Sequence, residues 1–181
     1  MNPLDRTKLS RQRYIVILAF FTAFAVTVYI LENLIPKPLP FMKLGLSNVV
    51  ILVLLMTGDV RAAILVAAAK TLLGGLLAGT LISPTTLLSG GGTALSLFCM
   101  IVLHELPLRF SILGISIAGA VSHNFAQISL VRWLLIKENS IFCLTPILIL
   151  MGIVTGIITG YLAKILIERL DLASIEKYAG R

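Results

Sequence analysis

Six apolar runs, separated by short breaks of polar residues, Gly and Pro, constrain this chain more than any other feature of its sequence. A helix needs about 20 apolar residues to cross a bilayer core of roughly 30 Å. Runs without strand-like alternation predict helices, because in lipid every backbone polar group must be satisfied within the segment or a closed barrel. The expected spans are about 14–32, 44–57, 60–80, 84–103, 111–136 and 144–167. The second run is short, so we expect it to cross a thin part of the bilayer, to be partly re-entrant, or to be buried among its neighbours.

The composition agrees with an all-α integral membrane protein, a bundle of six transmembrane helices. Hydrophobic residues make up 58% of the chain, charged residues 13%, and the mean hydropathy is +1.03. A soluble domain carries about 25% charged residues, so too little polar surface remains here to cover a globule in water. Cys99 and Cys143 lie in apolar runs without metal-ligand spacing, and we interpret them as core residues. We expect no metal and no cofactor.

The distribution of Lys and Arg predicts the orientation in the membrane. The formal net charge is +7, and the basic residues gather near the two ends of the chain rather than in a patch with interleaved aromatic residues. We therefore exclude nucleic acid as a partner. Because cytoplasmic loops are enriched in Lys and Arg, both termini are expected in the cytoplasm. The predicted organisation is a basic N-terminus at 1–13, a transmembrane domain at 14–168 and a cytoplasmic tail at 169–181.

Several polar side chains lie within the apolar runs or at their ends. Such groups are costly in a membrane and are therefore candidates for function. With the direction of each span assigned, most of them converge on one basin that faces outward. Our hypothesis is that the inner members contact a small-molecule substrate, two others lie at the mouth of the basin, and a serine lies in the outer half of the fourth span. The inner residues are Asn48, Lys70, His123, Asn124 and Gln127, the mouth residues are Glu32 and Lys43, and the serine is Ser89.

Several of these residues also have a structural interpretation. Lys70 either lines a cavity or pairs with a carboxylate or reaches an interface. His123 either binds substrate or is a core histidine whose hydrogen bonds are satisfied. Asn124 and Gln127 suit hydrogen bonds between helices, which contribute around 1 kcal/mol each. The alternatives stay open from the sequence alone.

Small residues recur at spacings that favour close contact between helices. Ala19 and Ala23 are four residues apart in the first span. Gly152, Gly156 and Gly160 form two consecutive GxxxG steps in the last span. Small residues at this spacing let helix backbones approach closely. The pattern indicates either packing within the monomer or docking to another membrane subunit.

Three strings carry a resemblance to a known family. They are residues 43–48 (KLGLSN), 110–127 (FSILGISIAGAVSHNFAQ) and 152–160 (GIVTGIITG). They resemble the bacterial Gx transporter family, also labelled heptaprenyl diphosphate synthase component I, and the resemblance covers roughly residues 14–165. One departure concerns Lys70, where the family usually has arginine. Lysine keeps the charge but loses the planar fork, which puts bidentate anion binding there in doubt.

That family in turn resembles the substrate-binding (S) subunits of energy-coupling-factor (ECF) transporters, which have six helices and cytoplasmic termini. The resemblance implies a multi-pass protein of the bacterial cell membrane that captures a small solute from the outer side. It implies that Ala19 and Ala23 dock on a transmembrane coupling subunit, and that separate ATPase subunits supply the energy.

The acidic residues argue against catalysis by this chain. Prenyl diphosphate synthases hold Mg²⁺ and diphosphate with clustered carboxylates, as hard cations require. Here the acids are scattered: Asp5, Glu32, Asp59, Glu105, Glu138, Glu168, Asp171 and Glu176. A Walker A motif is also missing. We therefore predict a non-enzyme, with two alternatives to the importer: a scaffold for a flavin or quinone electron-transfer assembly, or an accessory subunit that anchors a soluble polyprenyl synthase.

Overall fold

A computed structural model of the chain describes residues 3–34, 45–108 and 110–169, and all regular elements in these ranges are helices. The elements are α1 (Pro3–Leu34), α2 (Asn48–Met56), α3 (Val60–Leu77), α4 (Pro84–Glu105), α5 (Ile112–Leu134), the 3₁₀ helix η1 (Asn139–Leu144) and α6 (Thr145–Arg169). The predicted all-α class is confirmed. Helices α3 to α6 lie close to the expected spans, whereas α1 begins before the first apolar run.

Local sequence signals explain where the helices begin and end. Gly58 closes the turn between α2 and α3 with a φ of +79°, a conformation that side chains with a Cβ rarely adopt. Asp59 then caps α3, because its carboxylate accepts a hydrogen bond from the backbone N–H of Ala62 at 2.8 Å. Ser111 caps α5 in the same way, accepting from the N–H of Gly114 at 3.1 Å. These breaks are local, so the sequence alone predicts them.

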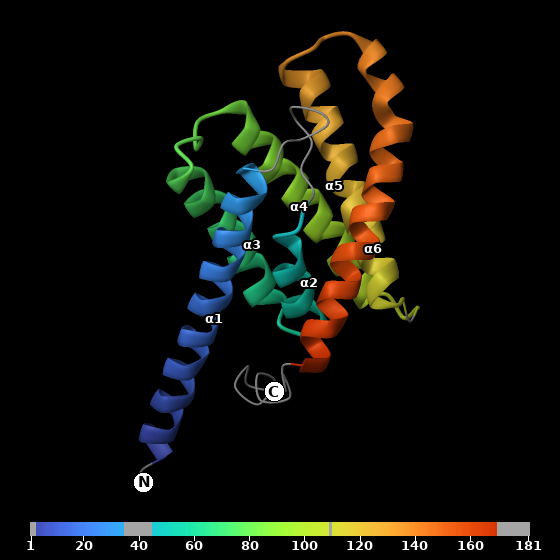
Figure 1. Cartoon of the computed structure of the whole chain (residues 1–181). Coiled ribbons are helices and arrows are strands. Elements are labelled where there is room, and N and C mark those ends of the chain that lie inside the picture. The colour runs from blue at the N-terminus through green and yellow to red at the C-terminus, as the bar shows by residue number, and fades with distance from the viewer. Residues whose placement is uncertain (1–2, 35–44, 109, 170–181) are drawn as a thin grey trace.

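Helix α2 forms the centre of the bundle. Figure 1 shows α1 on one side, α5 and α6 on the other, and α2 between them, where it contacts α1, α3, α4 and α6. All residues from Val49 to Leu55 are buried. Its nine residues extend only about 14 Å. The short second run is thus a buried core helix, and α2 by itself does not cross a bilayer.

Four helical segments are long and apolar enough to cross a membrane, so the chain is a multi-pass membrane protein. They are Arg11–Leu34, Val60–Leu77, Pro84–Glu105 and Asn139–Arg169. Helix α5 has 23 residues but is not among them. Its polar residues His123, Asn124 and Gln127 are buried inside the bundle, and they lower the apolar character of α5. The prediction of six full crossings is therefore not confirmed.

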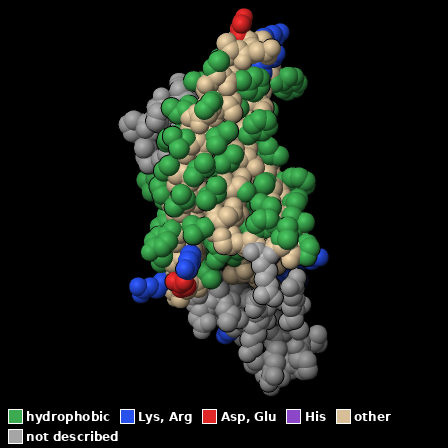
Figure 2. Space-filling view, turned by 90° about the vertical axis from the view of Figure 1, so that its right-hand side faces the viewer, with side chains coloured by type: hydrophobic (Ala, Val, Ile, Leu, Met, Phe, Trp, Pro, Cys, Tyr) green, Lys and Arg blue, Asp and Glu red, His purple; other side chains and the backbone are tan. Residues whose placement is uncertain are grey.

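Hydrophobic and charged side chains occupy different parts of the surface. Figure 2 shows a face covered along its length by hydrophobic side chains, with Lys, Arg, Asp and Glu confined to its two ends. The beginning of α1 and the end of α6 lie at the same end of the molecule (Figure 1). An apolar band between two charged ends is the distribution that a bilayer requires.

Candidate functional site

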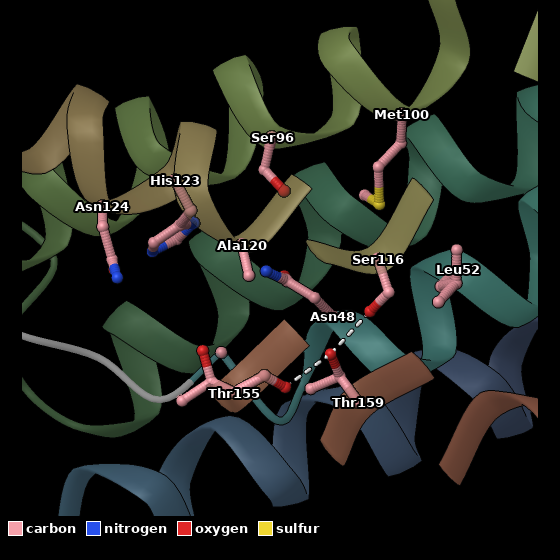
Figure 3. A pocket seen from close by; sticks show the side chains of 11 residues that line it. Asn48, Leu52, Ser96, Met100, Ser116, Ala120, His123, Asn124, Thr155 and Thr159 are labelled. Atoms are coloured by element: carbon pink, nitrogen blue, oxygen red, sulfur yellow. Dashed lines mark hydrogen bonds between the residues drawn. The ribbon is translucent and has the colours of Figure 1, made fainter. Parts of the chain in front are cut away.

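A small polar pocket lies where α2, α4, α5 and α6 meet (Figure 3). Its lining residues are Gly45, Asn48, Leu52, Ser96, Met100, Ser116, Ala120, His123, Asn124, Thr155 and Thr159. We call this set the polar pocket. Its volume is about 10 Å³, which is close to the space that one ordered water molecule needs. Any larger guest requires the surrounding helices to separate.

Lys70 reaches the polar pocket through Asn48. The Lys70 side chain is only 2% exposed, and its Nζ donates hydrogen bonds to Ser47 Oγ at 3.0 Å and to Asn48 Oδ1. Asn48 lines the pocket, whereas Lys70 lies behind it. The ammonium thus holds the first turn of α2 against α3 and sets the orientation of the Asn48 amide.

Glu32 fixes the wall of the polar pocket beside Asn48. Its carboxylate is buried near the end of α1 and accepts a hydrogen bond from the backbone N–H of Gly45. Gly45 has a φ of +74° and lines the pocket. Glu32 therefore lies next to the pocket without lining it, while Lys43 falls outside the described residues, so the mouth of the predicted basin stays a prediction.

His123 and Asn124 both line the polar pocket, and their role in binding a substrate stays a prediction. Asn124 also bonds between helices, because its Nδ2 donates to the carbonyl of Leu148 on α6 at 2.9 Å. The His123 ring lies against α4 at Gly92, where an added Cβ would come within 2.8 Å of the ring. Close approach of this ring thus explains the last glycine of the run at 90–92.

Ser89 and Gln127 are buried but do not line the polar pocket. Within the described part of the chain, Gln127 Nε2 has no hydrogen-bond partner. Of the five inner polar groups that the sequence predicts in one region, three line the same pocket: Asn48, His123 and Asn124.

Four hydroxyl groups that line the polar pocket are not among the candidates selected from the sequence. They belong to Ser96, Ser116, Thr155 and Thr159, all of them buried. Serine and threonine are readily tolerated in a membrane helix, so they do not stand out from the sequence. One signal was present: Thr155 and Thr159 are four residues apart and share the buried face of α6 with its glycines.

A second hollow opens on the side of the bundle between α4, α5 and α6. This lateral groove has a volume of about 410 Å³, and its lining is mostly apolar, with Phe98, Val102 and Phe125 among its members. Asn124 lines both the lateral groove and the polar pocket. One amide side chain thus stands between a polar interior and an apolar surface groove.

A family model described as heptaprenyl diphosphate synthase component I matches residues 21–166. This chain belongs to that family. Component I is a non-catalytic subunit, and catalysis belongs to the partner component, in agreement with the predicted non-enzyme. No curated protein and no solved structure gives a significant match. The predicted similarity to ECF S subunits is not confirmed and stays a prediction.

Proposed function

We propose that this chain is a non-catalytic membrane subunit that binds a small polar solute in the polar pocket and presents it to partner subunits, as in an importer. The observation that carries the proposal is Ser96. Its hydroxyl is buried, lines the pocket and has no hydrogen-bond partner among the described residues. A buried polar group without a partner costs about 1–3 kcal/mol, which a bound guest would remove.

The lining of the polar pocket supports binding rather than chemistry. It consists of hydroxyl, amide, imidazole and apolar groups, and none of its residues is acidic. Nowhere in the described ranges do three or more His, Cys, Asp or Glu side chains gather in a way that could hold a metal. Helices α2, α4, α5 and α6 each contribute residues to the lining of the pocket. A guest bound there would therefore contact all four helices and couple their positions.

Native mass spectrometry of the purified chain tests this proposal. The expected result is a small polar molecule that is retained through purification. His123→Ala and Asn124→Ala should each lower its affinity by about tenfold or more, since each leaves part of the guest unpaired. Ser122→Ala is the matched control, because Ser122 lies on the same helix but lines the lateral groove instead. Unchanged affinity in both pocket variants would exclude the polar pocket as the binding site.

A second candidate function follows from the family description and the lateral groove. In this alternative the chain is the membrane component of a polyprenyl synthase and anchors a soluble catalytic partner near its lipid product. A largely apolar groove of about 410 Å³ has the size of a small-molecule site. It faces the side of the bundle, where an isoprenoid chain can enter from the bilayer.

One experiment separates the two functions. The tagged chain is purified from its own host membranes in a mild detergent, and its partners and lipids are identified together. A soluble prenyltransferase and a bound polyprenyl lipid would support the synthase component. A membrane coupling subunit with two ATPase subunits and a polar solute would support the importer. Leu95→Trp, which fills the lateral groove, should remove only the lipid.

The charge asymmetry of the sequence yields a prediction about topology. The start of α1 and the end of α6 lie at the same end of the molecule, which agrees with termini on one side of the membrane. We expect residues 1–13 and 170–181 in the cytoplasm and Lys37 outside, because Lys and Arg favour the cytoplasmic side. Cysteine labelling of intact cells measures this. An external C-terminus would contradict six crossings and the outward-facing basin.

A second prediction concerns Ala19 and Ala23. Both are exposed and line a groove between α1 and α3 with Leu73, Leu76 and Leu77. If this groove receives a helix of a partner subunit, replacing both alanines by leucine should abolish co-purification of the partner while the monomer stays folded. Two added isobutyl groups would hold the helices apart.

The control for this experiment is Phe24→Trp, which adds bulk on another exposed face of α1. It should leave assembly unchanged. If the partner co-purifies with the double-leucine variant as well as with the control, the groove contacts lipid and not a subunit.

A further inference from the structure

On one side of the polar pocket, every hydroxyl hydrogen is already donated to an oxygen atom of the protein. A hydroxyl has a single hydrogen to donate. Thr159 Oγ1 donates to the carbonyl of Thr155 at 2.9 Å and shares this hydrogen with the carbonyl of Gly156 at 3.2 Å. Since carbonyls cannot donate, Ser116 must be the donor in its 2.8 Å contact with Thr159 Oγ1 (Figure 3). Thr155 Oγ1 donates to the carbonyl of Gly152 at 3.3 Å.

Toward the polar pocket, these three hydroxyls can therefore act only as hydrogen-bond acceptors. Ser116, Thr155 and Thr159, from α5 and α6, all line it. Each hydroxyl keeps acceptor capacity after its hydrogen is used. We call these three residues the acceptor wall.

The opposite side of the pocket carries donors. The Lys70 ammonium has no lone pair, so the Asn48 atom that it contacts must be the carbonyl oxygen. The amide nitrogen is therefore the Asn48 atom that Lys70 does not contact. Figure 3 shows this nitrogen among the side chains that line the pocket, and the hydroxyl of Ser96 points into the same space. The Ser96 hydroxyl is 1% exposed and has no hydrogen-bond partner in the described part of the chain, so its hydrogen is available. Asn48 and Ser96 form the donor wall.

We infer that the polar pocket selects a neutral group with an acceptor on one edge and a donor on the other, such as a primary amide. This inference rests on the proposed function and names the class of solute. A carboxylate would direct its lone pairs at those of the acceptor wall. A donor-only cation would leave the Asn48 amide and the Ser96 hydroxyl unpaired. The Lys70 ammonium donates to Ser47 and Asn48 and does not line the pocket.

Three planar probes of equal shape test this polarity. Formamide has an acceptor edge and a donor edge, formate has only acceptors, and formamidinium has only donors. Each has three heavy atoms, so the pocket must open little to admit it. The full chain, labelled with ¹⁵N-asparagine in detergent, is titrated with each probe while the Asn48 side-chain amide resonance is followed. Formamide should shift it saturably, with an affinity about tenfold or more above that of formate and formamidinium.

Asn48→Asp reverses the donor wall while keeping the fold. A carboxylate at this position still accepts from the Lys70 ammonium but presents an acceptor where the wild type presents a donor. We expect formamidinium to bind this variant more tightly than formamide, measured by the shift of the backbone amides of α2. Ser129→Ala, on α5 and outside the pocket lining, is the control and should leave the order of the probes unchanged.

The outcomes separate this inference from the proposed function. Formate binding as tightly as formamide, or the absence of a saturable shift with formamide, would overturn the assigned polarity. If the purified chain still retains a polar solute that His123→Ala releases, the proposed function stands and only the polarity is wrong. If no solute is retained either, both fail.

Discussion

Replacing Gly156 by alanine is expected to destabilise the folded chain by about 3 kcal/mol, at the upper end of what overpacking costs. At this position α6 crosses α5, and an added Cβ would lie 2.6 Å from the Cα of Ile117. Because the obstacle is backbone and not the end of a flexible side chain, the two helices must move apart. The separation would also spoil the contacts of the neighbouring Thr155 and Thr159 with the polar pocket.

Gly90→Ala is the matched control for this prediction. Gly90 is also a helical glycine, in α4, but an added Cβ there would lie 3.4 Å from Thr71 Cγ2, an ordinary contact. Its replacement should be neutral or stabilise the helix by up to about 1 kcal/mol, the difference in helix propensity. Thermal unfolding in detergent compares the two variants. Equal unfolding temperatures would mean that the close crossing of α5 and α6 contributes nothing to stability.

Lys70→Met is expected to lower both the stability of the chain and its affinity for solute. The substitution leaves Ser47 Oγ and Asn48 Oδ1 without their donor. Unpaired buried groups cost about 1–3 kcal/mol each. Methionine also removes the cost of burying a charged ammonium, but this gain offsets only part of the loss. We expect a net destabilisation of about 2 kcal/mol. Affinity should fall as well, because nothing then fixes the Asn48 amide toward the polar pocket.

Lys164→Met provides the comparison. Lys164 forms an exposed ion pair with Glu168 at 3.9 Å on α6, and such pairs contribute about 0–1 kcal/mol. The Lys164→Met substitution should leave the unfolding temperature and the affinity for solute almost unchanged. If Lys70→Met melts like Lys164→Met and binds solute as the wild type does, Lys70 neither anchors α2 nor positions Asn48. Loss of stability with intact affinity would assign Lys70 to the scaffold alone.

The class of the fold, most helix limits and the family follow from the amino-acid sequence alone. Apolar runs and their breaks act locally: Gly58 turns the chain and Asp59 caps the next helix whatever the rest of the molecule does. The cost of polar groups in lipid is also local, which is why the sequence suffices to select Asn48, His123 and Asn124 as candidates. The spacing of the GxxxG steps in α6 predicts close contact between helices, but it does not say whether that contact lies within the monomer.

How these elements meet depends on the packing of the whole bundle. Three features depend on which helix faces join. The buried helix α2 lies at the centre, Gly156 contacts Ile117 of α5, and Lys70 acts through Asn48. The hydroxyls of Ser96 and Ser116 carry no strong signal in a sequence, because serine is tolerated on any face of a membrane helix. Ser116 bonds Thr159, far away along the chain, and Ser96 has no hydrogen-bond partner among the described residues. The polarity of the pocket is therefore a property of helix packing, which no local pattern encodes.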